Sequence, residues 1–389
     1  MSGVRTQRRA ERTAGRRAAR RRAMVAAASA VVAAAAAAGV LSQTSRDGGT
    51  ERAAPSVART TAPAPLPVRP SPTPTPPKPS ASPSRAPEPS RSAAPRPVRT
   101  RTAAAALYRH PGSQVLDWVR AHRSDPRRSV IEARIAAQPS AVWFTEYDPG
   151  AVTGKVRSVT SAAAAANRTA VLVAYAIPDR DCGGASEGGA PDLGAYDRWI
   201  GEFAAGLGDR PVLVILEPDS IAQADCLSAG QRSARFAALG RAARTLKAAN
   251  PRAKVYFDAG HSGWHPVAEQ AAALRSAEAG TSGDGIFTNV SNFHGTAEEV
   301  AYARRVLAAL GGRPGLGAVI DTSRNGNGAP SAGQWCDPDG RAIGRAPTTD
   351  TGEADIDAYL WVKLPGESDG CKGGAGSFSP EYAYELATG

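Results

Sequence analysis

The chain has 389 residues and a formal net charge of +11, and such an excess of positive charge is typical of nucleic-acid-binding proteins. The excess is confined to residues 1–106, which carry 19 Arg or Lys and 4 Asp or Glu, against 28 and 32 in residues 107–389. The longer part is mildly acidic, so the composition argues against a nucleic-acid-binding domain, and we expect no nucleic acid partner.

Residues 1–41 have the layout of an export signal. An Arg-rich stretch, residues 5–22, precedes an uncharged, Ala-rich run of 18 residues from Met24 to Leu41. A positive flank followed by an apolar segment is typical of a signal peptide, and a run of this length also suits a membrane anchor. We therefore expect a secreted or extracellular protein, either released or tethered to a membrane at its N-terminus. The alternative is that the basic arm itself binds nucleic acid or anionic lipid.

Residues 42–106 are rich in Pro, Ser, Thr, Ala and Arg and include the run Pro70–Pro77. This composition cannot bury a core, and Pro-rich segments extend as polyproline-like spacers. The sequence therefore predicts a disordered linker that holds the folded part away from a membrane or cell wall.

Residues 107–389 alternate between short apolar runs and longer helical stretches. Short runs rich in β-branched and aromatic residues predict buried strands. The predicted strands are 141–144, 170–177, 212–216, 254–257, 285–290, 316–320 and 358–362. The predicted helices are 153–167, 193–207, 229–249, 266–279 and 296–310. This alternation predicts an α/β fold of parallel βα units, and seven such strands indicate a barrel.

Polar side chains follow nearly every predicted strand. Glu217 and Asp219 come directly after the apolar run Val212–Leu216, and carboxylates placed beside a core are costly. A helix cap at Asp219 or Ser220 explains one such strand end but not all of them. In a βα barrel the strand ends meet on one face, where these enzymes keep their active sites. The sequence therefore predicts an active site built from these loops.

Several well-known motifs are absent from the chain. Ser220 is not in a Gly-x-Ser-x-Gly turn, and His261 and His265 lack the glutamate of a His-Glu-x-x-His zinc site. The segment Gly326–Gly328 lacks the third glycine of a dinucleotide fingerprint, and no phosphate-binding loop occurs. We therefore expect neither a metal nor an organic cofactor.

Four cysteines, Cys182, Cys226, Cys336 and Cys371, lie in the acidic part. No Cys-x-x-Cys pair occurs, which argues against a zinc ribbon or a thioredoxin-like redox site. In an exported chain these cysteines predict two disulfides. Three pairings are available, and proximity in sequence favours Cys182–Cys226 with Cys336–Cys371.

Carboxylates beside aromatic residues suit the hydrolysis of a polysaccharide. Cleavage of a glycosidic bond needs an acid that protonates the leaving oxygen and a second carboxylate that activates water or attacks directly. Sugar rings stack on aromatic faces, and Trp143, Trp264 and Trp335 lie in or beside the strand-end loops. Trp361 lies within the last predicted strand, and we assign it to the barrel wall or core.

Five segments of the folded part resemble glycoside hydrolase family 6, the cellulase family of endoglucanases and cellobiohydrolases. They occur in family order at residues 175–182, 216–222, 258–264, 334–336 and 361–370. The resemblance covers residues 107–389 and implies a glycoside hydrolase catalytic domain over that range. It implies a distorted seven-stranded parallel β/α barrel that hydrolyses β-1,4-glucosidic bonds with inversion.

The motif match implies a role for individual residues. Asp219 is implied to be the general acid, Asp181 to raise its pKa, and Asp369 to be the candidate base, acting directly or through a water relay. Tyr175 is implied to crowd the distorted sugar at the cleavage point. The implied substrate-binding residues stack on sugars or hydrogen-bond to them: Trp143, His261, Trp264, Asn289, Trp335, Lys363 and Glu367.

The length of the folded part bears on the mode of attack. It has 283 residues, and residues 335–357 are too few to form the full tunnel roof of a cellobiohydrolase. We expect an open cleft, internal cleavage of cellulose or a related β-1,4-glucan, and a monomer. The chain shows no cellulose-binding module, which argues against efficient attack on crystalline cellulose. The alternatives are a cellobiohydrolase of the same family and a non-catalytic glycan-binding barrel.

Overall fold

The centre of the fold is a parallel sheet of seven strands in the order β1-β2-β3-β4-β5-β6-β7. The computed structural model describes residues 106–331 and 333–389, so the expected export segment and nearly all of the expected linker lie outside the described residues. The strands are β1 (Val142–Phe144), β2 (Ala170–Ala174), β3 (Val212–Leu216), β4 (Ala253–Asp258), β5 (Gly285–Thr288), β6 (Gly317–Asp321) and β7 (Ile356–Leu360).

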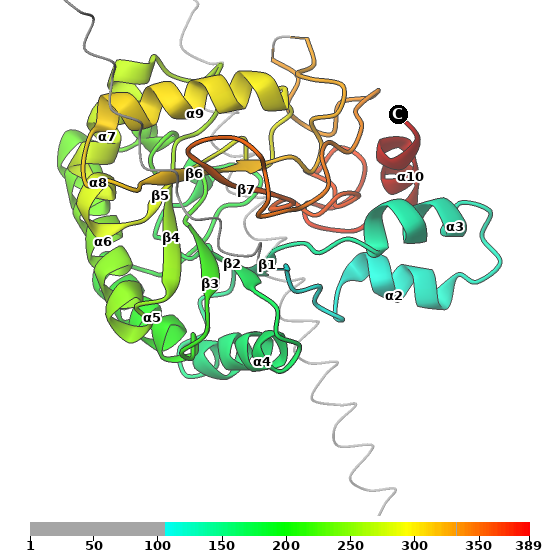
Figure 1. The fold of residues 1–389 in the computed structure, drawn as a ribbon, viewed down its shortest axis with the longest axis horizontal. Helices are drawn as coiled ribbons and strands as arrows, with labels where there is room; N and C mark the ends of the chain where they lie inside the picture. Colours follow the sequence, from blue (N-terminus) through cyan, green and yellow to red (C-terminus); the bar gives the residue numbers. More distant parts are fainter. Residues whose placement is uncertain (1–105, 332) are drawn as a thin grey trace, which may run out of the picture. The chain divides into compact units, whose positions relative to one another are not determined.

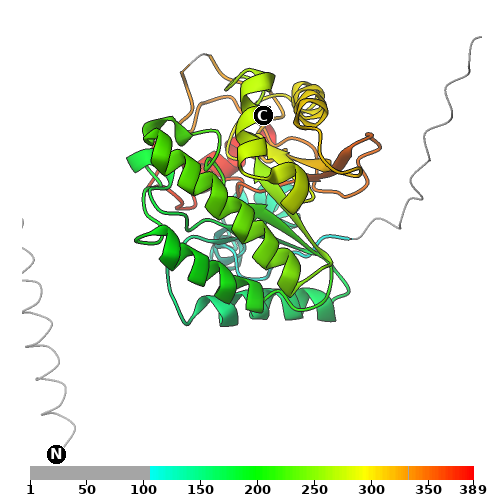
Figure 2. The same cartoon turned by 90° about the vertical axis from the view of Figure 1, so that its left-hand side faces the viewer.

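Helices alternate with the strands and cover one face of the sheet (Figures 1 and 2). They are α4 (Val152–Ala165), α5 (Leu193–Ala205), α6 (Ala229–Ala249), α7 (Val267–Ser276), α8 (Ala279–Ser282) and α9 (Thr296–Leu310). The predicted fold class is confirmed, since seven parallel strands curl into a half-barrel with alternating helices. Short 3₁₀ turns, Asp181–Gly183 and Ala224–Cys226, lie in the loops after β2 and β3.

Alternate residues of each strand face two separate cores. On β3, Leu213 and Ile215 belong to the cluster inside the half-barrel, whereas Val214 and Leu216 belong to the cluster beneath the helices. Both faces of the strand are therefore buried, which is why its sequence is continuously apolar instead of alternating.

The edge strands β1 and β7 stand at the two ends of the strand order. The segments beside them are linked by a main-chain hydrogen bond from Ala141 N to Trp361 O (3.0 Å). The indole Nε1 of Trp143 also donates to the carbonyl of Val362 (2.7 Å). Apart from such contacts, β1 and β7 do not pair with each other in the described sheet, so the half-barrel is open between these two edges. The site described below lies beside this opening.

A third packed group lies beside this opening and was not predicted from the sequence. It contains α2 (Gln114–Ala121), α3 (Arg128–Ile131), a π-helical segment (Glu132–Ala136) and the C-terminal α10 (Pro380–Thr388), which lie side by side in Figure 1. Their shared core includes Trp118, Ile131 and Trp361. Trp361 is thus buried as expected, although it packs against these helices and not inside the half-barrel.

Within residues 106–331 and 333–389, no helix is both long enough and apolar enough to cross a membrane.

Candidate active site

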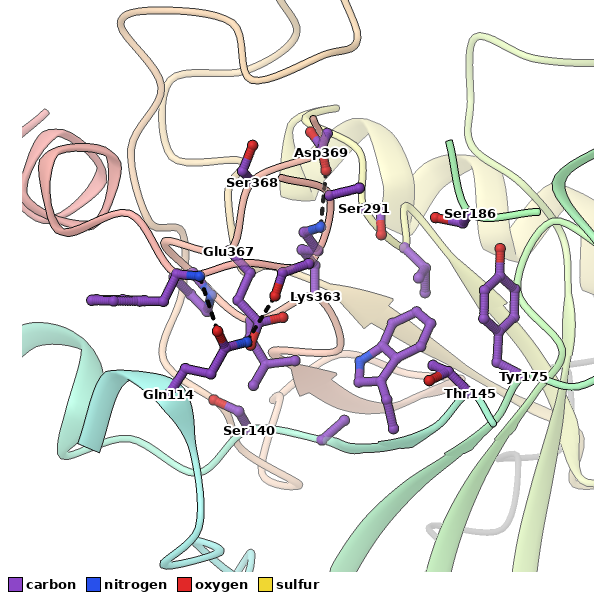
Figure 3. A pocket seen from close by; sticks show the side chains of 18 of the residues that line it. Gln114, Ser140, Thr145, Tyr175, Ser186, Ser291, Lys363, Glu367, Ser368 and Asp369 are labelled. Carbon is purple, nitrogen blue, oxygen red and sulfur yellow. Dashed lines mark hydrogen bonds and ion pairs between the residues drawn. The ribbon is translucent and has the colours of Figure 1, made fainter. Parts of the chain in front are cut away.

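A cleft of about 1100 Å³ lies where the loops after the strands meet the third group of helices. It is lined by all but one of the residues proposed above for catalysis or sugar binding: Trp143, Tyr175, Asp181, Asp219, His261, Trp264, Trp335, Lys363, Glu367 and Asp369. Figure 3 shows Lys363 directed at Asp369, and Gln114 of α2 directed at Glu367. The fold therefore brings together residues that are far apart in the sequence, such as Gln114 and Glu367, which are 253 positions apart.

Asp219 follows β3 with a left-handed backbone (φ +66°) and is partly buried at the cleft. Burial raises the pKa of Asp219 well above its ordinary value, and the neighbouring carboxyls of Asp258 and Asp181 raise it further. A carboxyl held in its protonated form can donate a proton, so Asp219 has the property that a general acid needs.

Asp258 is a contributor to this site that the sequence analysis did not single out. It ends β4, is buried, and accepts hydrogen bonds from Ile221 N (3.1 Å), Ala222 N (2.8 Å) and Gly260 N (2.9 Å). Burial raises the pKa of Asp258, although these hydrogen bonds act in the opposite direction. Its position directly after the predicted strand 254–257 was the available signal in the sequence.

Glu217 has a structural role at the end of β3. Its buried carboxyl accepts hydrogen bonds from Ala176 N (3.0 and 2.9 Å) and Ile177 N (3.0 Å). Burial raises the pKa of Glu217 to about 7, and the two main-chain donors partly offset this effect. These bonds tie the end of β3 to the loop after β2, and they end the predicted strand 170–177 early at Ala174.

The loop after β2 carries Asp181 in a left-handed conformation (φ +56°). The Oδ2 of Asp181 accepts a hydrogen bond from Ser186 N (2.7 Å). The next residue, Cys182, forms a disulfide with Cys226, one of the pairs that proximity in sequence favoured. Non-glycine residues with positive φ cluster at functional sites, because surrounding contacts must hold the strained backbone.

Tyr175 and Trp143 form one aromatic wall of the cleft. Their rings meet edge to face with centroids 5.4 Å apart. The guanidinium of Arg180 lies over the Tyr175 ring at 4.6 Å and donates to the carbonyl of Thr145 (2.5 Å). Burial raises the pKa of the Tyr175 phenol, and the Asp219 and Asp181 carboxyls add to this, so the hydroxyl stays neutral.

His261 and Trp264 lie in the loop after β4 and line the cleft from another side. The His261 ring stacks on His294 (centroids 4.2 Å apart) and lies 5.1 Å from the Trp264 ring. Burial lowers the pKa of His261 to about 3, and His294 and His265 add to the decrease. His261 is therefore a neutral hydrogen-bonding group and not an acid at neutral pH.

Asp369 lies on the opposite wall and has a cation at each carboxylate oxygen. Arg324 Nη1 lies 2.7 Å from Oδ2, and Lys363 Nζ lies 2.9 Å from Oδ1. Arg324 is completely buried, and its guanidinium lies 4.4 Å from the Phe293 ring. The disulfide Cys336–Cys371, the second pair favoured by proximity, joins this loop to the segment carrying Trp335.

Glu367 lies near Asp369 and accepts a hydrogen bond from Gln114 Nε2 (2.8 Å). Burial raises the pKa of Glu367 to about 7, whereas Lys363 and the Gln114 hydrogen bond lower it. Gln114 also donates to Gly376 O (2.7 Å) and accepts from Phe378 N (3.0 Å). The unpredicted helix α2 thus contributes a side chain to this wall of the cleft.

Asn289 is a correction to the sequence analysis, because it is fully buried and does not line the cleft. Its amide donates to His294 O (3.1 Å) and Asp321 O (2.9 Å), and its oxygen accepts from His294 N (3.0 Å). With these groups occupied by the protein, Asn289 holds the loop after β5. That loop presents Ser291 and Asn292 to the cleft instead.

No cluster of His, Cys, Asp or Glu capable of holding a metal ion occurs among the residues that the structure describes.

Several carboxyl groups, among them Asp219 with its raised pKa, lie among aromatic side chains in a cleft at the strand ends of an α/β half-barrel, and this arrangement is typical of a glycosidase. The chain belongs to glycosyl hydrolase family 6, since the model of that family matches residues 99–388. This match confirms the resemblance inferred from the five segments.

Two sequence relatives and one solved structure support this membership. Endoglucanase 1 of Streptomyces sp. (strain KSM-9) is 55% identical over 273 residues, which are 70% of this chain and 75% of the relative. Endoglucanase A of Thermobispora bispora is 50% identical over 281 residues, covering 72% of this chain and 61% of the relative. The endoglucanase Cel6 from Mycobacterium tuberculosis, solved with methyl-cellobiosyl-4-deoxy-4-thio-β-D-cellobioside, is 41% identical, with a TM-score of 0.68. That comparison covers 73% of this chain and 97% of the other.

Proposed function

We propose that the protein hydrolyses internal β-1,4-glucosidic bonds of cellulose or a related β-glucan by an inverting, single-displacement mechanism. The observation that carries the proposal is Asp219, a carboxyl at the cleft whose pKa is raised well above its ordinary value by burial and by Asp258 and Asp181. A group that stays protonated near neutral pH can protonate the oxygen of the leaving sugar.

The reaction is one displacement at the anomeric carbon. Asp219 donates its proton to the glycosidic oxygen as the bond between that oxygen and the anomeric carbon breaks. A water molecule attacks the opposite face of the sugar, and its proton passes to Asp369, directly or through a second water. Exchange with solvent then returns a proton to Asp219 and removes one from Asp369, so each turnover consumes one water.

The aromatic walls bind and shape the sugar chain. Trp143, Trp264 and Trp335 supply faces for stacking, and Tyr175 crowds the sugar at the cleavage point. His261, Lys363 and Glu367 supply hydrogen bonds to sugar hydroxyls. The partly buried position of most of these groups supports such a role, because hydrogen bonds and ring contacts are stronger where water is excluded.

Internal cleavage requires that a long chain can enter the cleft from the side. Trp335, in the segment where a cellobiohydrolase would carry its tunnel roof, has 59% of its surface exposed. The exposed ring and the endoglucanase names of the relatives favour an open cleft over the cellobiohydrolase alternative.

The expected N-terminal organisation belongs to the same proposal. Residues 1–41 direct export and are either cleaved or retained as an anchor, residues 42–106 act as a spacer, and residues 107–389 act extracellularly as a monomer. A fusion of residues 1–60 to a reporter should be exported, and retention of that reporter in the cytoplasm contradicts this part.

The test of the activity uses Asp219→Asn on soluble β-glucan, with Asp225→Asn as a matched control in the same disulfide-linked segment. Loss of a general acid should lower kcat by about 100-fold or more. Asp225 is largely exposed and should tolerate the change, with kcat within about twofold. Rapid loss of viscosity identifies internal cuts, and NMR of the first product should show the α-anomer. Undiminished activity of Asp219→Asn, or a β-anomer formed first, contradicts the proposal.

A further inference from the structure

Asp337 is a buried carboxylate that neither lines the cleft nor has a place in the reaction described above. It follows Cys336 directly and lies two residues after Trp335, in a left-handed conformation (φ +43°). Charged residues without solvent contact are rare unless they are paired or hydrogen-bonded, so the partners of Asp337 show its purpose.

The hydrogen-bond donors to its carboxylate all come from the loop that carries Asp369. The Oδ1 of Asp337 accepts a hydrogen bond from the main-chain N of Asp369 itself (2.8 Å). The Oδ2 accepts from Ser368 Oγ (2.6 Å), Cys371 N (2.9 Å) and Lys372 N (2.9 Å). Four donors from residues 368–372 therefore converge on one carboxylate, which acts as the fixed centre around which this loop is folded.

The contact is reciprocal, because the main-chain N of Asp337 donates to Oδ2 of Asp369 (3.2 Å). Arg324 is shared by the two carboxylates, with Nη1 2.7 Å from Asp369 Oδ2 and 3.9 Å from Asp337 Oδ1. The backbone position of Asp369 and the orientation of its side chain thus both depend on Asp337.

The hydrogen-bond donors keep Asp337 ionised in spite of its position. Burial opposes the charge, but the bonds from Ser368, Asp369, Lys372 and Cys371 outweigh it and lower the pKa of Asp337 to about 2. The negative charge that organises the loop is therefore present throughout the pH range in which a glycosidase works.

We propose that Asp337 is a positioning residue that sets the place and direction of the Asp369 carboxylate for the reaction. The inference rests on the proposed role of Asp369 as the base.

The disulfide Cys336–Cys371 does not replace this function. It joins neighbouring residues of both segments, with Cα atoms 5.8 Å apart, but leaves the torsions of residues 368–370 free. Gly370 in particular has a φ of +129°, a conformation that glycine adopts readily. The covalent bond keeps the two segments together, including Trp335, while the hydrogen bonds to Asp337 determine where Asp369 points.

The test compares Asp337→Ala and Asp337→Asn with a control, Asp339→Asn, all measured on a soluble cello-oligosaccharide. Asp339 lies in the same segment with 92% of its side chain exposed, and it pairs with Lys372 on the surface. An Asn at 337 retains one acceptor oxygen, whereas Ala retains none. A displacement of a reacting group by about 1 Å costs about 100-fold, so kcat should fall by about that factor in Asp337→Ala. It should fall about tenfold in Asp337→Asn, with KM within about threefold in both, and the Asp339→Asn control should stay within about twofold.

Asp369→Asn and the binding of the oligosaccharide, measured by calorimetry, complete the design. If Asp369→Asn loses activity while both Asp337 variants keep kcat within about twofold, the positioning role is wrong and the proposed function stands. If Asp369→Asn keeps full activity, the assignment of the base is wrong, and the positioning role is overturned with it. A loss of oligosaccharide binding and of the near-ultraviolet circular dichroism in both Asp337 variants would indicate a merely structural residue and would also overturn it. An intact spectrum, unchanged affinity and a graded loss of kcat from Asp to Asn to Ala support the proposal.

Discussion

Glu217 provides a direct test of how the site is built, because replacing it by Gln should make the protein more stable at pH 8 but not at pH 4.5. Its carboxyl is fully buried, and burial raises its pKa from 4.5 to about 7. Between pH 4.5 and about 7, Glu217 is therefore protonated in the folded protein but ionised in the unfolded chain. Ionising Glu217 costs the folded state free energy, so stability falls as the pH rises through this window.

The size of the effect follows from the width of the window. Each pKa unit corresponds to about 1.4 kcal/mol, so a rise from 4.5 to about 7 costs the wild type about 3 kcal/mol above pH 7. Gln is neutral at every pH and retains an acceptor oxygen for Ala176 N and Ile177 N. Wild type and Glu217→Gln should be about equally stable at pH 4.5, and the variant should be about 3 kcal/mol more stable at pH 8.

Equilibrium unfolding in urea at several pH values measures this difference. Other buried carboxyls, among them Asp258 and Asp321, also have raised pKa values and lower the stability of both proteins alike. The difference between wild type and variant isolates Glu217. Glu146→Gln serves as the control, since Glu146 lies on the surface and pairs with Lys155. A difference that does not change between pH 4.5 and 8 would refute the reasoning.

Three further predictions concern the cleft. In the Asp258→Asn variant, the alkaline decline of kcat/KM should shift to a lower pH than in wild type. The reason is that the substitution removes a carboxyl that helps to keep Asp219 protonated. An alkaline decline at the same pH as in wild type contradicts this prediction. Trp335→Ala should raise KM about fivefold with kcat nearly unchanged, as expected when about 1 kcal/mol of stacking is lost equally from substrate and transition state. A loss confined to kcat would exclude simple stacking. Replacing Cys336 and Cys371 by Ser opens a loop with a sequence separation of 35 and should lower the unfolding free energy by about 4 kcal/mol on the chain-entropy estimate. Denaturant unfolding checks this value, and a change below about 1 kcal/mol would show that the hydrogen bonds of Asp337 suffice.

The sheet was predictable from sequence because each strand is buried on both faces and is therefore continuously apolar. The ends of the strands were less predictable. Residues 175–177 continue the apolar pattern of β2, yet two of their main-chain donors turn to Glu217 instead of a neighbouring strand. Hydrophobic periodicity reports burial, and it does not report which acceptor a main-chain donor uses.

The helices of the third group escaped prediction for a different reason. α2 and α10 are short and partly exposed, and the residues that bury them, such as Trp118 and Ala383, belong to one hydrophobic cluster although they are far apart in the sequence. Only the three-dimensional structure shows that this group brings Gln114 to the cleft.

The candidate site illustrates the same limit at the level of single side chains. Asn289 and Asp219 both follow a buried strand with a left-handed backbone, with φ of +67° and +66°. Their positions in the sequence suggest that both side chains line the cleft. Asn289 instead donates from its amide to main-chain carbonyls of the protein, whereas Asp219 lines the cleft. A pattern can identify the rim of a barrel, whereas the direction of each side chain depends on contacts that are distant in sequence.

The two walls of the cleft use the same physical device. On the side of the proposed acid Asp219, buried Glu217 accepts main-chain N–H groups from the loop after β2, and Cys182–Cys226 links that loop to the segment after Asp219. On the side of the proposed base Asp369, buried Asp337 accepts N–H groups from the loop of Asp369, and Cys336–Cys371 lies beside it.

The two buried carboxyls differ in pKa, and both the number of their donors and the depth of their burial contribute to the difference. Glu217 has two main-chain donors, which do not overcome its burial, and its pKa is about 7. Asp337 has four donors, which do overcome it, and its pKa is about 2. Stability that depends on Asp337 is therefore present above pH 4 and is lost as the pH falls toward 2, whereas the cost of ionising Glu217 appears as the pH rises toward 7. The two walls should consequently loosen at opposite ends of the pH scale. The wall that carries Asp369 should loosen at low pH, and the wall that carries Asp219 should loosen at high pH.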